Sequence, residues 1–206
     1  MVQFVKQSHE ILTPIDGEQM LKKIEYAGRT CYKSEDKATG DSHLKFASMI
    51  VKNHHFSVIE HVSVTVRFIT NRGVSHELVR HRMASFSQES TRYCNYAKGK
   101  FGNELTVIDQ KELFQSHDAY ETWKKAMRSA ERYYLHLIAN GVSPQVARGT
   151  LPIDLKTEIV VTANLREWRH ILDLRTSPAA HPNIRFLMDG LLTELKQKIP
   201  VIFEDI

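Results

Sequence analysis

Apolar and polar side chains alternate in several short stretches of the chain. The clearest is residues 62–68, where three valines and a phenylalanine are separated by polar residues. A period of two places every second side chain on the same face of a β-strand. Similar short stretches predict strands at residues 2–7, 105–108 and 158–163.

Longer segments carry apolar residues at spacings of three and four, which is the period of an amphipathic helix. Asp16 is expected to cap a helix that ends near Cys31, and Ser42 to cap a second helix that carries Phe46 and Ile50. The other helices are predicted from about Ser75 into Arg82, from about Glu112 to Asn140, after Ser143, over residues 166–175 and after Pro182. Residues 34–41 are expected to form a loop and residues 54–60 a turn.

The order of these elements indicates the fold class. Strands and helices are mixed without a regular strand–helix alternation, which favours an α+β fold over a doubly wound parallel sheet. No internal repeat, low-complexity tract or linker divides the chain, so residues 1–206 are predicted to form one domain.

Composition narrows the classes of protein further. Hydrophobic residues make up 42% of the chain, which is enough for a globular core, and the formal net charge of +4 permits anionic ligands without requiring nucleic acid. No apolar run is long enough to cross a membrane, and residues 1–6 do not resemble a signal peptide, so a cytoplasmic protein without a membrane partner is expected. Cys31 and Cys94 form no Cys-x-x-Cys pair, which disfavours a structural zinc site.

Residues 80–93 hold the densest group of candidate binding residues. The potential cations are Arg80, His81, Arg82 and Arg92, and the hydroxyl residues among them are Ser85, Ser87, Ser90 and Thr91. Arginine forks bind phosphate or carboxylate through two parallel hydrogen bonds, and hydroxyls supply further donors. Unless it is only a solvated basic loop, the segment is expected to run from a helix end into a loop that binds an anionic ligand.

One alternative is an RNA-binding or single-strand-binding module. Its binding face would combine phosphate-binding arginines with stacking aromatic rings, namely Arg80, Arg82, Arg92, Phe86 and Tyr93. Such a module predicts a steep dependence of binding on salt and no bound chromophore.

A second alternative is a metal-dependent nucleotide hydrolase that uses His55, Glu60 and His61. The chain lacks the His-Glu-x-x-His motif, so no metal site is expected. It also lacks Gly-x-Gly-x-x-Gly and P-loop motifs, and any dinucleotide must therefore be bound in another way.

Several motifs occur together in one order along the chain. They are Arg80-His81-Arg82 followed by seven residues and Ser90, the segment His55–His61, the segment Ala147–Pro152, and Asn164-Leu165-Arg166 with His170 and Arg175. This arrangement resembles the flavin-dependent thymidylate synthases, whose signature is Arg-His-Arg, seven residues and Ser. The matched blocks extend from about His55 to Arg175, most of the chain.

The resemblance implies a reductive methylation of dUMP to dTMP. Methylenetetrahydrofolate would supply the one-carbon unit, and NADPH would reduce a tightly bound FAD. It also implies an α+β domain with a mixed or antiparallel sheet and long flanking helices. The expected assembly is a homotetramer whose nucleotide and flavin sites are shared between subunits, with no nucleic-acid partner.

The resemblance also implies roles for individual residues. The positions that match family contacts to FAD are Ser57, Arg80, His81, Arg82, Gln88, Asn164, Leu165, Arg166 and His170. Those that match contacts to dUMP are Glu77, Leu78, Val79, Arg80, Gln88, Glu89, Ser90, Thr91, Arg92, Arg148 and Arg175. Arg175 would activate the uracil ring by stabilising negative charge at its edge. Neither cysteine falls on a matched contact, so no cysteine nucleophile is expected.

The sequence departs from the family pattern at a few of these positions. Glu77 and Gln88 stand where some members have Gln and Glu, respectively. Ala179 stands where others carry His, and His170 occupies a position that can be Asn. These differences concern details of the contacts rather than the class of reaction.

Overall fold

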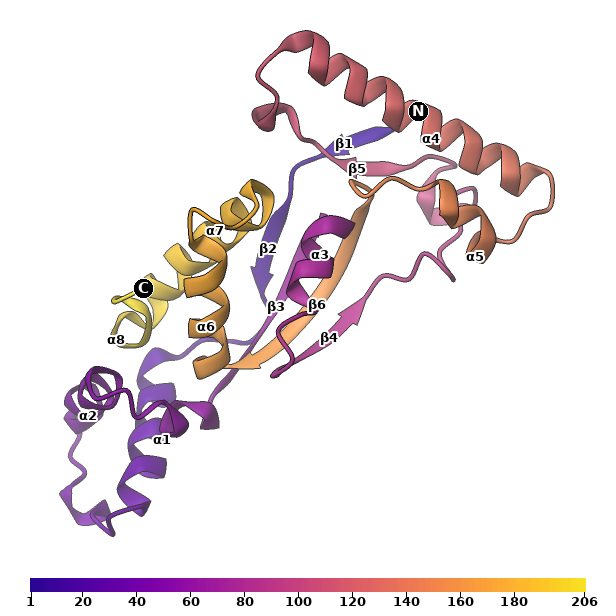
Figure 1. Ribbon diagram of the computed structural model, residues 1–206. Helices are drawn as coiled ribbons and strands as arrows, with labels where there is room; N and C mark the ends of the chain where they lie inside the picture. The colour runs from indigo at the N-terminus through magenta and orange to yellow at the C-terminus, as the bar shows by residue number, and fades with distance from the viewer. The chain divides into compact units, whose positions relative to one another are not determined.

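The computed structural model describes the backbone of residues 1–206 and the side chains of all of them except Lys100 (Figure 1). The chain packs as two compact units. The first unit comprises Met1–Ser8, Phe68–Arg80 and Ser87–Ile159, and the second comprises His9–Arg67, His81–Phe86 and Val160–Ile206.

Two sheets form the β structure. The larger sheet has the strand order β2-β3-β6-β4, with β2 at Ser8–Ile11, β3 at Ser63–Asn71, β6 at Lys156–Asn164 and β4 at Ala84–Gln88. The smaller pairs β1 (Gln3–Val5) in parallel with β5 (Thr106–Ile108). The predicted α+β class is therefore confirmed.

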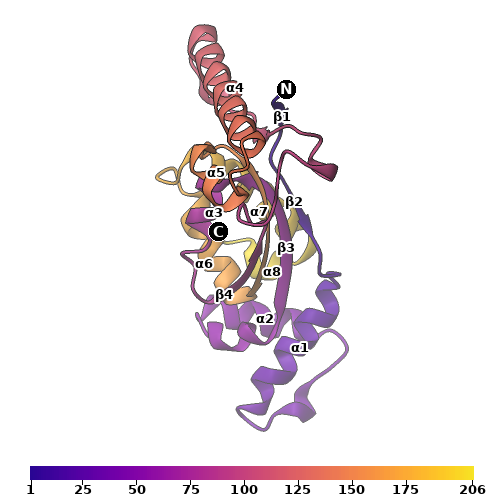
Figure 2. The same ribbon diagram turned by 90° about the vertical axis from the view of Figure 1, so that its right-hand side faces the viewer.

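The first unit contains α3 (Arg72–Leu78), α4 (His117–Ala139) and α5 (Pro144–Ala147), with short 3-10 turns η3 (Gly99–Phe101), η4 (Lys111–Leu113) and η5 (Arg148–Thr150). Figures 1 and 2 show the long helix α4 alongside β1. Met127 of α4 packs with Val2, just before β1, and with Val107 of β5, and Phe4 and Trp123 complete the cluster. Burial of these side chains holds α4 on the small sheet.

Asp154 connects several elements of the first unit. Its Oδ1 accepts hydrogen bonds from Asn71 Nδ2 at 2.9 Å and Gln110 Nε2 at 3.0 Å. Its Oδ2 accepts one from Trp123 Nε1 of α4 at 2.9 Å, and its backbone carbonyl accepts one from the N–H of Ile108. Asp154, two residues before β6, thus bonds to the end of β3, to β5 and the residues after it, and to α4.

The second unit is mostly helical. Its elements are α1 (Gly17–Thr30), η1 (Glu35–Lys37), α2 (Ser42–Lys52), η2 (Phe56–His61), α6 (Leu165–Thr176), α7 (Pro182–Lys198) and α8 (Pro200–Phe203). Gly28 lets α1 approach α2 closely, since a Cβ there would lie 2.5 Å from Phe46 Cζ. Trp168 of α6 is fully buried, and its Nε1 donates to the carbonyl of Val64 in β3.

One of the two expected helix caps is confirmed. Asp16 accepts a hydrogen bond from the backbone N–H of Gln19 at the start of α1. Asn164, which was not predicted as a cap, accepts one from the N–H of Glu167 at the start of α6. The prediction that Ser42 caps the second helix is wrong, because Asp41 occupies the cap position. Ser42 is the first helical residue, and its hydroxyl bonds to the backbone of Thr39 instead.

Several boundaries differ from the sequence expectations. The single strand predicted at residues 2–7 is two strands, β1 and β2, because periodicity does not show where a chain changes its pairing partner. Residues 54–60, expected as a turn, include most of η2. The helix expected from Ser75 begins at Arg72, where the Asn71 side chain accepts from Val74 N–H, and it ends at Leu78.

The long helix is shorter at its start than predicted. It begins at His117, where Ser116 Oγ accepts from Ala119 N–H, rather than near Glu112. Leu113, an apolar residue inside the predicted helix, belongs to η4 and is 44% exposed. No helix among the described residues is both long and apolar enough to span a membrane.

Candidate active site

The Arg-His-Arg motif lies between α3 and β4 rather than on a helix. Arg80 and Arg82 are exposed, whereas His81 is buried. The residues after the motif were expected to form a loop, but Ala84–Gln88 form strand β4. The polar residues Ser85 and Ser87 of this strand are exposed and alternate with the half-buried Ala84 and Phe86, an alternation with only two apolar residues.

In the second unit, His81 contacts Arg175, the proposed catalytic residue. Arg175 Nε, near the end of α6, donates a hydrogen bond to His81 Nε2 at 3.0 Å. Because Nε2 accepts this bond, the proton of the neutral imidazole is assigned to Nδ1. Nδ1 lies 3.6 Å from Glu167 Oε1, which is too long for a good hydrogen bond, and the His170 ring packs edge-on at 5.6 Å.

His81 is held in its neutral form. Burial, followed by the positive charge of Arg175 and the influence of His170, lowers the pKa of His81 to about 4. Burial also raises the pKa of Glu167, although His170 and Arg166 act in the opposite direction. A neutral His81 can accept the Arg175 hydrogen bond at physiological pH, whereas a protonated one could not.

Substituting His81 tests this arrangement through the pH dependence of stability. The folded pKa lies below the unfolded value of about 6.5, so the unfolded chain binds more protons between about pH 6.5 and pH 4. His81 should therefore lower the free energy of unfolding as pH falls through this window, by on the order of 3 kcal/mol in all. Stability should be fully retained above about pH 6.5 and level off below about pH 4.

The variant His81→Gln keeps an acceptor oxygen for Arg175 Nε but cannot titrate. Denaturant unfolding across this pH range should show a flatter profile for His81→Gln than for the wild type. His136→Gln, at an exposed site on α4, is the matched control and should keep the wild-type slope. An unchanged slope in His81→Gln would contradict a buried neutral His81.

The second unit also contains a cavity of about 690 Å³. It is lined by His54, Phe56, Glu60, Met83, Asn164, Arg166, Glu167, Arg169, His170, Asp173, Asp205 and Ile206. Three of the predicted cofactor residues, Asn164, Arg166 and His170, therefore face one space. Its volume is typical of a small-molecule site.

Two arginines of the cavity wall are paired with carboxylates. Arg166 Nη1 lies 2.6 Å from Glu60 Oε1, and both side chains are partly exposed. Arg169 binds Asp205 through two hydrogen bonds of 2.6 and 2.8 Å, and its guanidinium lies 4.9 Å from the centroid of the Phe56 ring. The Arg169 pair is bidentate, so it fixes the guanidinium plane at this wall.

Two other predicted cofactor residues of the second unit are placed differently. Ser57 lies in η2 and is exposed, but it does not line the cavity. Leu165 has a fully buried side chain, so any ligand contact by this residue would be through its backbone.

In the first unit, Gln88 ends strand β4 with its side chain directed inward. Gln88 Nε2 donates to Ser75 Oγ at 2.8 Å and to Thr157 Oγ1 at 3.2 Å. Both amide hydrogens are used by these bonds, which leaves Oε1 as the group of Gln88 suited to a ligand donor. Sequence reasoning did not identify Ser75 and Thr157 as partners, because their hydroxyls come from separate elements.

The arginines expected to bind the phosphate lie on neighbouring segments of the first unit. Arg92 Nε donates to Gln145 Oε1 at 3.3 Å, and Gln145 lies on α5, three residues before Arg148. Ser90 Oγ accepts from the N–H of Arg92 at 3.2 Å. Arg92 and Arg148 are both exposed, so their guanidinium groups are accessible to an anion.

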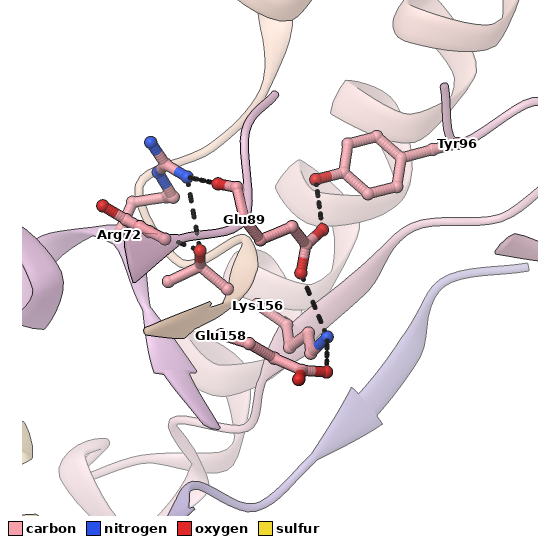
Figure 3. A network of polar contacts seen from close by, with 7 residues as sticks. Arg72, Glu89, Tyr96, Lys156 and Glu158 are labelled. Carbon is pink, nitrogen blue, oxygen red and sulfur yellow. Dashed lines mark hydrogen bonds and ion pairs between the residues drawn. The ribbon is translucent and has the colours of Figure 1, made fainter. Parts of the chain in front are cut away.

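Glu89 is the centre of a polar network in the first unit (Figure 3). Its carboxylate accepts hydrogen bonds from Tyr96 Oη at 3.0 Å and Lys156 Nζ at 3.2 Å. Arg72 Nη1 donates to the backbone carbonyl of Glu89, and Lys156 also pairs with Glu158. Sequence reasoning named Glu89 as a nucleotide contact and missed its partners.

The remaining predicted nucleotide contacts differ in their exposure. Leu78 is fully buried, Thr91 is 8% exposed, and Val79 is 41% exposed. Glu77 is half-buried on α3. These roles stay predictions.

The metal-hydrolase alternative gains no support from the structure. Among the described residues, no group of three His, Cys, Asp or Glu side chains could hold a metal ion. Glu60 is paired with Arg166, while His55 and His61 are exposed.

Comparison with known proteins shows the family to which the chain belongs. Residues 15–201 match the family model described as thymidylate synthase complementing protein. The flavin-dependent thymidylate synthase of Mycobacteroides abscessus is 35% identical over 213 residues, covering 94% of this chain and 81% of the relative. That of Mycobacterium avium is 35% identical over 209 residues, with the same coverage.

A solved structure shows the same fold. It is the UMP/dUMP methylase PolB from Streptomyces cacaoi bound with 5-Br dUMP, with a TM-score of 0.80 over 98% of this chain and 95% of that one. The two sequences are 24% identical. The chain therefore belongs to the thymidylate synthase complementing protein family, that of the flavin-dependent thymidylate synthases, and is an enzyme of this type.

Proposed function

We propose that this protein, as one domain over residues 1–206, converts dUMP to dTMP, with methylenetetrahydrofolate as the one-carbon donor and NADPH as the reductant of bound FAD. The observation that carries the proposal is the hydrogen bond from Arg175 to His81, which joins the signature motif to the arginine expected at the uracil ring. The relatives are flavin-dependent thymidylate synthases, and the protein of similar fold is a UMP/dUMP methylase, which supports the nucleotide substrate.

The lining of the cavity in the second unit supports the proposal of a bound flavin dinucleotide. Its wall carries Arg166 and Arg169, each paired with a carboxylate in this structure, while Asn164 and His170 add polar groups and Phe56 offers an aromatic ring. Cations and hydrogen-bond donors of this kind suit a pyrophosphate. We propose that Asn164, Arg166 and His170 hold FAD here, and that Arg166 exchanges its Glu60 partner for the cofactor. Bound flavin supplies the redox chemistry, and the protein supplies orientation and electrostatics.

Residues of the first unit are proposed to bind the nucleotide. Arg92 and Arg148 would neutralise the phosphate, and Ser90 would donate a hydrogen bond to it. Gln88 would accept from a donor of the ligand through Oε1. Arg175 would stabilise negative charge on the uracil oxygens as carbon 5 becomes nucleophilic, which is an electrostatic contribution to the rate.

No cysteine nucleophile is part of this proposal. Cys31 is exposed just after α1. Cys94 is partly buried and packs against the cluster that contains Tyr96 and Leu105. This packing of Cys94 is compatible with a structural role.

The proposal predicts that the purified protein carries FAD. Released flavin should be identified as FAD by chromatography after denaturation, and the flavin absorption should bleach on addition of NADPH without oxygen. The loaded protein should then form dTMP from dUMP and methylenetetrahydrofolate.

Substitutions in the cavity wall localise the flavin. Arg166→Ala should lower the FAD content, because it removes a cation from the proposed pyrophosphate site. Arg132→Ala, on the exposed side of α4 in the first unit, is the control and should retain FAD. Failure of the wild type to bind FAD after reconstitution with excess cofactor would refute the proposed function.

A further inference from the structure

Glu89 lies between two proposed nucleotide contacts, yet its own polar groups are bound within the protein. Its N–H donates to the carbonyl of Glu158 at 2.9 Å, and its carbonyl accepts from Arg72 Nη1 at 3.0 Å. Its carboxylate accepts from Tyr96 and Lys156, and its side chain is only 14% exposed. Figure 3 shows the carboxylate directed at these two side chains. Glu89 is thus occupied by partners other than a ligand.

Both partners of the carboxylate remain proton donors at neutral pH. Burial raises the pKa of Tyr96, and Glu89 adds to the effect. Burial alone would lower the pKa of Lys156, but its hydrogen bond to Glu158 and the charge of Glu89 raise it above the ordinary value. The Lys156 contact is therefore a charge-assisted hydrogen bond, which is stronger than a neutral one.

The Tyr96 hydrogen bond joins the two ends of a short loop, residues 89–96. Within the loop, the N–H groups of Tyr93 and Cys94 donate to the carbonyl of Ser90, which closes a turn. The exposed Arg92 lies on this turn. The far end of the loop is anchored because the Tyr96 ring is 5% exposed and packs on the rings of Phe101 and Tyr134.

We propose that Glu89 is a positioning residue, whose carboxylate joins the ends of loop 89–96 and ties the loop to Lys156 of β6, so that Ser90 and Arg92 are preset for a nucleotide phosphate. This inference rests on the proposed function. Presetting a loop reduces the entropy that binding must remove, so its loss weakens ligand affinity. The chemical step should change less, because the Glu89 carboxylate is bonded to Tyr96 and Lys156 within the protein.

The test compares Glu89→Gln with the wild type in the FAD-loaded enzyme. Glutamine keeps the length of the side chain and removes its charge. The dissociation constant for dUMP, measured by calorimetry, should rise roughly tenfold, and the KM for dUMP should rise with it while kcat changes by less than about threefold. Glu158→Gln is the matched control, because it removes the other carboxylate bonded to Lys156 and leaves the Glu89 carboxylate in place. Its affinity for dUMP should stay within about twofold of wild type.

Two further variants identify the partners. Lys156→Met should weaken dUMP binding by a similar factor. The double variant with Glu89→Gln should be little worse than either single variant, because both changes remove the same Glu89–Lys156 interaction. Tyr96→Phe removes a single hydroxyl and keeps the packed ring. It provides the decisive measurement if Glu89→Gln does not fold, and dUMP affinity equal to wild type in Tyr96→Phe would then overturn the proposal.

Amide hydrogen exchange separates this inference from the proposed function. Without nucleotide, amides of residues 90–94 should exchange faster in Glu89→Gln than in the wild type or Glu158→Gln. If the wild type does not bind dUMP, the proposed function fails, and the exchange rates alone decide whether Glu89 holds the loop. In a protein that binds dUMP, unchanged exchange or an unchanged dissociation constant in folded Glu89→Gln overturns the positioning role.

Discussion

Replacing Arg175 with alanine is expected to abolish dTMP formation while leaving the fold intact. Arg175 lies near the end of α6 and is only partly buried, so its loss opens no cavity in the core. A cation that stabilises charge developing on the substrate typically contributes on the order of a hundredfold or more in rate. The hydrogen bond from Nε to His81 sets the plane of the guanidinium, which makes the stabilisation directional.

The measurement is dTMP formed per flavin, with FAD content and circular dichroism recorded for each variant. Arg175→Lys keeps a positive charge but not the planar fork, so its turnover should lie between those of Arg175→Ala and the wild type. Arg132→Ala is the control for removal of an arginine from a surface helix, and it should turn over normally. Near-normal turnover in flavin-loaded Arg175→Ala would remove this residue from the catalytic role.

Mixing two inactive variants is expected to restore activity. We propose that the enzyme is a homotetramer in which the dUMP held by Ser90 and Arg92 of one chain meets Arg175 of another. Ligand sites favour interfaces, and closed symmetry repeats such a shared site around the assembly. Arg92→Ala and Arg175→Ala should each be nearly inactive as pure proteins, because each leaves every site with one arginine missing.

After co-denaturation and refolding of equal amounts, about a quarter of the sites should combine an intact Arg92 with an intact Arg175, assuming random assembly of equivalent sites. Turnover should rise to about that fraction of the wild-type value. Mass spectrometry or a tag on one variant must confirm that the tetramers are mixed. Activity no greater than the sum of the two parents would show that both arginines serve the same chain's site.

The regular elements with a strong pattern could be predicted from the sequence. The alternating residues of β3 and the helix cap at Asp16 are local signals, and the structure confirms them. Strand β4 was not predicted, because its alternation is short and contains only two apolar residues, Ala84 and Phe86. Its place is set by pairing with β6, far along the chain.

The candidate site, like the fold, could be predicted only in part from the sequence. The motifs located the cations, and the structure brings Asn164, Arg166 and His170 to one cavity. Sequence alone could not indicate that His81 is neutral, since this depends on its burial beside Arg175. Nor could it pair Glu89 with Lys156, which lies 67 positions away in the chain. Such pairs depend on tertiary packing rather than on local sequence.

The hydrogen bonds of Asp154 affect how the first unit unfolds locally. One carboxylate satisfies Asn71, Gln110 and Trp123, and these three side chains come from different parts of the unit. Local unfolding of any one of these segments leaves a donor without its partner and weakens the hydrogen bonds of Asp154 to the other two side chains. Partial unfolding of α4 alone is therefore disfavoured, and these segments are expected to behave as a single cooperative folding unit.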